Sequence, residues 1–432
     1  MALYTYTRDD DNSSWSQQAY IKPSNAQQTS TFCLCFGNII KLDNNTLAVA
    51  ASDSSNQTTI TNGSGNASTD TSASLSGAVF VYTRSGTNWS QQAYIKASNA
   101  AAGDRLGSAI ALSGNTLVVG ATHEASDQTT ITNGTGSSSN NDNAGSGAVY
   151  VYTRSGTNWS QQAYIKASNN DVNDFFGTNV DIDGDTIVVG VGDEDSNQTT
   201  ITNGTGTSSN NDKAASGAVY VYTRSGTNWS QQAYIKASNS DASDYFGQSV
   251  SISGDTLAVG VPNEDSNQTT ITTTSSSDNS ATSSGAVHIF TRSGTNWSQQ
   301  AYIKPSNAVS GMSFGQPVFI KGDLLVVGAG SEDSNATTNS YGSTASSNTS
   351  LSNSGAVYVF ERSGTSWSQK AYIKVVNPRE DLNFPSSVHM DNTTIVAGSM
   401  WEKSSQQGIT NGTSASTDNS QTMNGAAWVY RF

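Results

Sequence analysis

The chain has few of the residues on which catalysis, cofactor binding and membrane insertion depend. Among its 432 residues are three histidines, two cysteines and six prolines, and only 12% of the residues are charged. No apolar run approaches the roughly 20 residues that a membrane-spanning helix requires, so we expect no membrane span. The histidines, His123, His288 and His389, are scattered, and the sequence has neither a nucleophile elbow nor a glycine-rich phosphate loop. These absences predict a protein that is not an enzyme.

The charge that is present has mostly one sign. Asp and Glu number 34 and Lys and Arg 20, which gives a net charge of −14. A polyanion repels phosphate backbones, so nucleic acid is not expected as a partner. An acidic surface attracts cations, calcium above all, although solubility is the plainer interpretation.

The two cysteines, Cys33 and Cys35, lie in the segment TFCLCFG. On a β-strand, residues i and i+2 share a face and are too far apart for an unstrained disulfide. Two cysteines also cannot supply the four ligands of a structural zinc site. We therefore expect both to be unbridged packing residues.

What the sequence has instead is a repeat. The segment GTNWSQQAYIK at 86–96 recurs unchanged from 156, 226 and 294, with near copies at 12–22 and 364–374. Its tryptophans are spaced by 74, 70, 70, 68 and 70 residues; they are Trp15, Trp89, Trp159, Trp229, Trp297 and Trp367. A fixed period of this kind indicates a solenoid, an array or a propeller.

Each period predicts four strands, here called A to D. In one period they are FGTNVDI (176–182), TIVVGV (186–191), GAVYVYTR (217–224) and WSQQAYIK (229–236). Strand B is apolar on both faces and should be buried on both. Strand D is the most polar and ends in a lysine, such as Lys166, which we expect to protect the outer edge of the sheet. The tryptophan of strand D should pack against the neighbouring sheet.

Six repeats of four antiparallel strands without helical periodicity predict an all-β fold, a six-bladed β-propeller of four-stranded antiparallel blades. We expect a single domain over residues 1–432, whose last blade is closed by the N-terminal strand within 1–22. The repeats that form the blades are approximately 33–96, 103–166, 173–236, 243–304, 311–374 and 381–432.

Three motifs resemble the FG-GAP repeat. FG begins strand A, VVGA or AVGVP ends strand B, and GAVYVYTR forms strand C, although FG weakens to Leu106-Gly107 and to Phe384-Pro385. This repeat builds the headpiece propeller of integrin α chains and occurs in many bacterial surface proteins. The resemblance implies a propeller at the cell surface or outside the cell. The family's DxDxDG calcium loop is reduced here to turns such as DGD at 183–185, which are too short for the about seven oxygens that calcium prefers.

The loops between strands B and C are about 20 to 27 residues long, and acidic residues recur in register around them. With Asn and carbonyl oxygens, these acids predict calcium sites that clamp the loops, and a solvated acidic rim is the alternative. The candidate ligands are Asp104, Glu124, Asp174, Glu194, Asp195, Asp244, Glu264, Asp265, Glu332 and Asp333.

Two further kinds of site are predicted on these loops. Loop-tip sequons are candidates for N-glycosylation, with chance matches as the alternative in a chain so rich in Asn, Ser and Thr. They are Asn62, Asn133, Asn203 and Asn411. A unique binding site should break the repeat symmetry, as Trp401 does, so this aromatic side chain either contacts a glycan or protein ligand or packs internally.

The predicted strands total 25, one more than six blades need. Segments 3–8 and 426–432 both have the pattern of strand C and compete for that position in the last blade. The surplus strand lies as an outer fifth strand, reflects a longer repeat array, or pairs with another copy of the chain. A head-to-tail pairing of the last kind does not close and gives filaments.

We therefore predict a non-enzymatic structural or adhesion protein, secreted or on the cell surface, whose partner is itself. The alternative is a module that recognises a glycan or a surface protein through its long acidic loops, with calcium as a possible cofactor.

Overall fold

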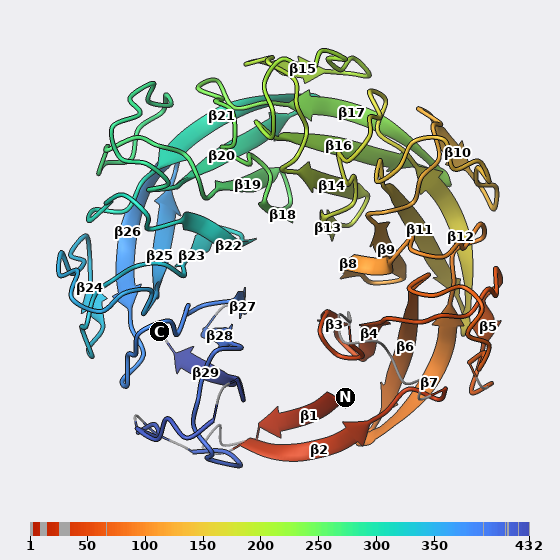
Figure 1. Ribbon diagram of the computed structural model, residues 1–432, viewed down its shortest axis with the longest axis horizontal. Helices are drawn as coiled ribbons and strands as arrows, with labels where there is room; N and C mark the ends of the chain where they lie inside the picture. Colours follow the sequence, from red (N-terminus) through yellow and green to blue (C-terminus); the bar gives the residue numbers. More distant parts are fainter. Residues whose placement is uncertain are drawn as a thin grey trace. The chain divides into compact units, whose positions relative to one another are not determined.

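The computed structural model in Figure 1 describes residues 3–8, 15–25, 35–65, 67–391, 393–410, 412, 414–421 and 423–431. Within these residues the secondary structure consists of β-strands, and no helix is long and apolar enough to cross a membrane. The strands form the antiparallel sheets of a six-bladed β-propeller, which confirms the predicted fold class. The chain divides into two compact units. One comprises Met1–Val191, Gly204–Ser209 and Tyr220–Tyr234, and the other Gly192–Asn203, Asn210–Val219 and Ile235–Phe432.

Strands A and B are the inner strands of each blade. The A strands are β3 (Ile40–Asp43), β8 (Leu106–Ser113), β13 (Asn179–Asp183), β18 (Ser249–Ser253), β22 (Phe314–Lys321) and β27 (Ser387–Met390). The B strands are β4 (Thr46–Ala51), β9 (Thr116–Ala121), β14 (Thr186–Val191), β19 (Thr256–Val261), β23 (Leu324–Ala329) and β28 (Thr394–Ser399). Every residue of β9 is buried, as expected for a strand that is apolar on both faces.

Strands C and D form the outer hairpin. The C strands are β6 (Ala78–Ser85), β11 (Ala148–Ser155), β16 (Ala218–Ser225), β20 (Ala286–Ser293), β25 (Ala356–Ser363) and β29 (Ala426–Arg431). The D strands are β7 (Asn88–Ile95), β12 (Asn158–Ile165), β17 (Asn228–Ile235), β21 (Asn296–Ile303) and β26 (Ser366–Ile373). With the N-terminal strands β1 (Leu3–Arg8) and β2 (Trp15–Ile21), these are the 25 strands that the sequence predicts.

Four short strands were not predicted. They are β5 (Thr61–Asn62), β10 (Ile131–Asn133), β15 (Ile201–Asn203) and β24 (Ser340–Tyr341), and all come from the long loop between strands B and C. In the second blade the loop folds back so that Ile131 pairs with Ile165, and the sheet order becomes β10-β12-β11-β9-β8. The loop therefore covers the outer edge of strand D with backbone hydrogen bonds.

The prediction that lysine protects this edge is wrong. Lys166 is 1% exposed, and the lysines at the equivalent positions of four other blades are equally buried. The loop strand already pairs the edge, so the lysine side chain is free to turn inward and bind the loop ends.

The FG and GA motifs meet between successive blades. Gly147, before strand β11, forms a parallel bridge with Phe176, and its φ of 79° lies in the left-handed region. A Cβ atom on Gly147 would lie 2.2 Å from the carbonyl oxygen of Phe176, so no other residue fits. Gly120 of β9 meets the carbonyl of Gly177 in the same way, with 2.0 Å left for a Cβ. The close approach of two backbones thus explains why both motifs contain glycine.

The cysteine prediction is also wrong, because Cys35 is disulfide-bonded. The chain has one other cysteine, Cys33, which lies outside the described residues. The prediction assumed an extended strand, whereas Cys35 lies in a non-strand segment that leads into a turn, before β3 begins at Ile40. The distance argument for i and i+2 on a strand does not apply there.

The two ends of the chain form incomplete sheets. Strands β1 and β2 pair in a two-stranded sheet, red in Figure 1, and β27, β28 and β29 form a three-stranded one. The pairing of Tyr4 with Tyr20 and the bulge after Thr5 repeat the register of Phe80 with Tyr94 in β6 and β7. The N-terminal hairpin is thus a C–D pair, and the closure of the last blade by an N-terminal strand remains a prediction.

Candidate functional site

Buried ion pairs fasten the long loops. After strand β12, the Nζ of Lys166 lies 2.9 Å from Oε2 of Glu124 and 2.8 Å from Oγ of Ser146. Glu124 follows strand B and Ser146 precedes strand C, so one ammonium group holds both ends of the loop between them. Four other blades repeat the arrangement, with Lys–carboxylate distances of 3.2, 2.7, 2.9 and 2.8 Å. The pairs are Lys96–Asp53, Lys236–Glu194, Lys304–Glu264 and Lys374–Glu332.

Burial has the largest effect on these lysines. It lowers the pKa of Lys166, and the adjacent Glu124 carboxylate opposes that change. Two buried charges stabilise a fold only when they are paired with each other and hydrogen-bonded. Removal of one partner leaves the other charge buried without a counter-charge, which destabilises the fold. We call each of these five Lys–carboxylate pairs a lysine anchor. An anchor therefore stabilises its blade only while both charged side chains are present.

The candidate calcium ligands all have partners within the protein. The carboxylates of Glu124, Glu194, Glu264 and Glu332 bind the buried lysines. Those of Asp195, Asp265 and Asp333 accept hydrogen bonds from the backbone N–H of Ala215, Ser283 and Asn353 at 2.7 to 2.8 Å. Those of Asp104, Asp174 and Asp244 accept one from the residue three positions earlier at 2.7 to 3.2 Å. Among the described residues, no three His, Cys, Asp or Glu side chains gather as a metal site. Calcium binding therefore stays a prediction.

Two of these aspartates have unusual acidity. Burial is the largest cause that raises the pKa of Asp104 to about 7, and the nearby Glu124 carboxylate adds to the effect. Asp244 has the same environment beside Asp241 and Glu264, and its pKa is also raised to about 7. Both side chains are about 4% exposed, and this burial favours the neutral carboxyl over the carboxylate below about pH 7.

The glycosylation candidates dock neighbouring blades. Asn62 accepts a hydrogen bond from the backbone N–H of Trp159 at 2.8 Å and donates one to its carbonyl at 3.0 Å. Asn133 and Asn203 bind the backbones of Trp229 and Trp297 in the same way. A glycan on these side chains would disturb the contacts. Asn411 lies outside the described residues, and glycosylation stays a prediction.

The same contact confirms that the motif tryptophan packs on the next sheet. The indole Nε1 of Trp159 donates to Oε1 of Gln92 at 2.9 Å, and Arg154 lies over the indole ring at 5.2 Å. Arg154 also donates to Oγ1 of Thr46 at 2.9 Å. Thr46, Gln92 and Asn62 thus form an acceptor set for the Arg–Trp pair of the following blade.

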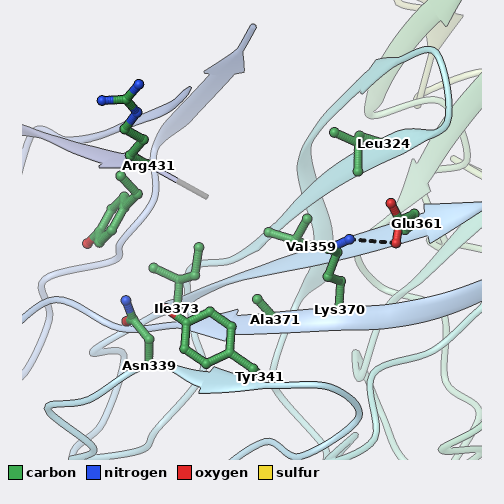
Figure 2. Close-up of a pocket in the computed structure, with 10 residues that line it drawn as sticks. Leu324, Asn339, Tyr341, Val359, Glu361, Lys370, Ala371, Ile373 and Arg431 are labelled. Atoms are coloured by element: carbon green, nitrogen blue, oxygen red, sulfur yellow. Dashed lines mark hydrogen bonds and ion pairs between the residues drawn. The ribbon is translucent and has the colours of Figure 1, made fainter. Parts of the chain in front are cut away.

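One blade has lost this acceptor set. In the fifth blade, Leu324, Lys370 and Tyr341 stand at the positions of Thr46, Gln92 and Asn62. They line a pocket of about 480 Å³ together with Asn339, Val359, Glu361, Ala371, Ile373, Tyr430 and Arg431. Figure 2 shows the ion pair between Lys370 and Glu361, 2.6 Å long, on one side of the apolar floor and Tyr341 on the other.

The pocket adjoins an open sheet edge. Among the described strands, β29 pairs with β28 alone, and no D strand follows it in that sheet. Val429 in the middle of β29 is 49% exposed, and Tyr341 at the pocket is 75% exposed. Within the described part of this unit, the pocket side of the fifth blade and the free side of β29 therefore have no strand paired over them.

Trp401 lies in the loop after β28, where it is 39% exposed, next to Met400 at 55%. Its backbone N–H donates to Oγ of Ser399 at 3.1 Å, and the indole ring remains partly in solvent. It is not a core residue, and it does not line the pocket.

The sequence analysis missed the lysine anchors and the pocket. A signal for the anchors exists, since all six copies of the motif end in Ile-Lys even where other positions vary. A signal for the pocket also exists, because the copy at 364–374 is the one in which Gln is replaced by Lys. That the lysines lie in the interior of the fold, and that the pocket residues meet at one place, follows only from the strand pairing.

A family model described as FG-GAP repeat matches residues 89–152, 159–222, 229–290 and 297–360, more than half of the chain. Each match begins at the motif tryptophan of strand D and ends in strand C of the next blade. A comparison with curated proteins finds no match.

Proposed function

The chain belongs to the FG-GAP repeat family, and from this premise we propose that it is a non-enzymatic structural or adhesion module whose copies associate with one another. FG-GAP repeats are typical of extracellular and surface proteins, so we place its work outside the cell or on its surface. The blades repeat their polar groups in register, whereas a single active site needs a unique set, which favours a scaffold over an enzyme.

The observation that carries this proposal is the mismatch between two incomplete sheets. Among the described strands, the sheet β27-β28-β29 has types A, B and C without D, and the hairpin β1–β2 has C and D without A and B. The strand β2, of type D, is therefore the one described partner for two strands of type C, β1 and β29. If β2 of one copy pairs with the free edge of β29 in another, the backbone N–H and C=O groups of that edge bond to protein in place of solvent.

The chemistry of the pocket fits such a strand. Elsewhere the D strand of a following blade lays its tryptophan on this face, so a second copy would place Trp15 over Lys370 and Arg8 near the carboxylate of Glu361. The two surfaces differ, so the contact is heterologous, and repeated head-to-tail contacts build filaments.

Complementation tests this proposal. We expect molar mass from light scattering to rise with concentration for the natural chain. Trp15→Ala removes the donor and Leu324→Arg fills the acceptor pocket, so each variant alone should remain at 45 kDa. An equimolar mixture retains one intact donor and one intact acceptor and should stop at the dimer. A natural chain of constant mass at all concentrations rejects self-association. Assembly that both variants leave intact rejects this interface, and the melting temperature of each variant checks its fold.

A second candidate function is the recognition of a glycan or surface protein, and the pocket is the observation in its favour. Its exposed Tyr341 offers a stacking face and its Asn339, Lys370 and Glu361 offer polar groups, in one blade only. The long acidic loops with Trp401 would extend this surface, with calcium as a cofactor. Binding to a glycan array that Tyr341→Ala abolishes, measured with calcium and with chelator, would favour this function over assembly.

A further inference from the structure

A buried tyrosine hydroxyl recurs in three blades and is missing from the fourth. In three blades a tyrosine of strand C donates its hydroxyl to an asparagine that follows strand D of the preceding repeat. The oxygen–oxygen distances are 2.5, 2.7 and 2.8 Å for Tyr150–Asn99, Tyr220–Asn169 and Tyr358–Asn307. All three tyrosines are fully buried.

In the fourth blade His288 of β20 takes the place of this tyrosine. It is 0% exposed and lies among Phe246, Phe290 and Tyr302, with ring centroids 5.5, 6.2 and 5.1 Å away. An imidazole is shorter than a phenol, so its Nε2 does not reach as far as the phenolic oxygen does. Asn239 stands at the position of Asn99, the asparagine whose oxygen accepts the phenolic hydrogen in the second blade.

Two buried polar atoms at this position have no hydrogen-bond partner among the described residues. They are Nε2 of His288 and Oδ1 of Asn239. The last blade provides a comparison: there Trp428 replaces the tyrosine, and Oδ1 of the equivalent Asn377 is likewise unpartnered. In the three blades that keep the tyrosine, the asparagine oxygen is satisfied. In the fourth and last blades the unpartnered asparagine oxygen therefore accompanies the loss of the hydroxyl.

The neighbouring contacts favour an acceptor at both atoms. Nδ1 of His288 lies 3.4 Å from Oε1 of Gln299 and 3.5 Å from Oγ of Ser275. Nε2 of Gln299 donates to the carbonyl of Thr273 at 3.1 Å, which orients Oε1 toward the imidazole. We therefore assign the proton to Nδ1, which donates it to Oε1, and this leaves Nε2 with a lone pair. The Nδ2 of Asn239 donates to Oε1 of Glu264 at 3.1 Å, so the unpartnered Oδ1 is the acceptor end of this amide.

We propose that the fourth blade contains a binding site for one water molecule, which donates one hydrogen to Nε2 of His288 and the other to Oδ1 of Asn239. A single hydroxyl has one hydrogen and satisfies one acceptor, whereas water has two. Buried waters in proteins occupy such positions, where several polar groups are left without partners. Calcium and magnesium are excluded by the donor set, because each requires six or more ligands, mostly oxygens.

A crystal structure of the full chain with bound solvent tests the site directly. We expect an ordered water within hydrogen-bond distance of both Nε2 and Oδ1. His288→Tyr should expel it and place the phenolic oxygen against Asn239, and the melting temperature should rise by a few degrees. The reverse change in the fifth blade, Tyr358→His, is the matched control and should create a second ordered water beside Asn307 and lower the melting temperature.

Nitrogen NMR gives an independent readout, because the chain has three histidines and His288→Tyr assigns the signal. We expect an Nδ1–H tautomer, with Nε2 shifted as an unprotonated acceptor. Empty density at the site, or an Nε2–H tautomer, would overturn the proposal, and so would a peak with metal-like coordination. All these outcomes are independent of whether copies of the chain associate.

Discussion

The Nζ of Lys166 lies 2.9 Å from Oε2 of Glu124, with 0% and 1% of the two side chains exposed. The pair joins the end of strand D to both ends of a loop that has little regular structure of its own. Five blades contain such a pair, and in each it fastens a loop that is rich in Ser, Thr and Asn.

Removal of one partner should destabilise the protein. Lys166→Met leaves the Glu124 carboxylate buried without a counter-charge, so we expect a loss of about 3–5 kcal/mol in the free energy of unfolding. Urea unfolding monitored by tryptophan fluorescence measures this loss. The double variant Lys166→Met, Glu124→Leu should recover much of it, because no charge is then buried. An equal loss in the single and the double variant would contradict the anchor.

The contact between Asn133 and Trp229 should hold adjacent blades together. Asn133→Leu removes the side-chain partner of the backbone N–H and carbonyl of Trp229, at a cost of about 1–3 kcal/mol. The matched control is Tyr341→Leu at the equivalent position of the fifth blade, where we expect a change close to zero. Thermal unfolding of both variants measures the difference. If Asn133→Leu melts at the same temperature as Tyr341→Leu, the asparagine has no role in holding adjacent blades together.

The repeat in the sequence was sufficient to predict the fold. The 70-residue spacing of tryptophans and the apolar pattern of strand B are local, so the 25 main strands could be assigned without knowledge of their neighbours. The strand pairs that the loops add, such as Ile131 with Ile165, depend on a loop that returns across the sheet, and no local pattern marks it.

The candidate sites were less predictable for the same reason. Glu124 and Asn62 were recognised as recurring residues, but their partners, Lys166 and Trp159, lie 42 and 97 residues away. A carboxylate that recurs in register has the same sequence pattern whether it binds a metal or a lysine. Only the position of the lysine, turned inward by the covered edge, distinguishes the two.

Asp104 should make stability depend on pH. Its pKa is about 7 in the folded chain and has the ordinary value of 3.8 in the unfolded chain, so between pH 3.8 and 7 the carboxyl is protonated only in the folded state. The contribution of this group to the free energy of unfolding is therefore fully present below pH 4 and is lost as the pH rises through 7. Glu124 favours the neutral form, and Lys96 and Lys166 oppose it. Asp104→Asn should therefore unfold at the same urea concentration as the natural chain at pH 4 and at a higher one at pH 8. A variant that loses stability at pH 8 would contradict a raised pKa.

His288 should have the opposite dependence. Burial lowers its pKa from 6.5 to about 4, with the hydrogen bond that it donates to Gln299 as a smaller opposing cause and Lys304 nearby adding to the decrease. The unfolded chain binds the additional proton between pH 6.5 and 4, so stability is present above 6.5 and falls as the pH decreases toward 4. His288→Tyr removes the titrating group, and the difference in melting temperature between variant and natural chain should widen from pH 7 to pH 4. The matched Tyr358→His should add a second loss over the same range. A constant difference across this range would show that His288 is protonated as readily in the fold as in the unfolded chain.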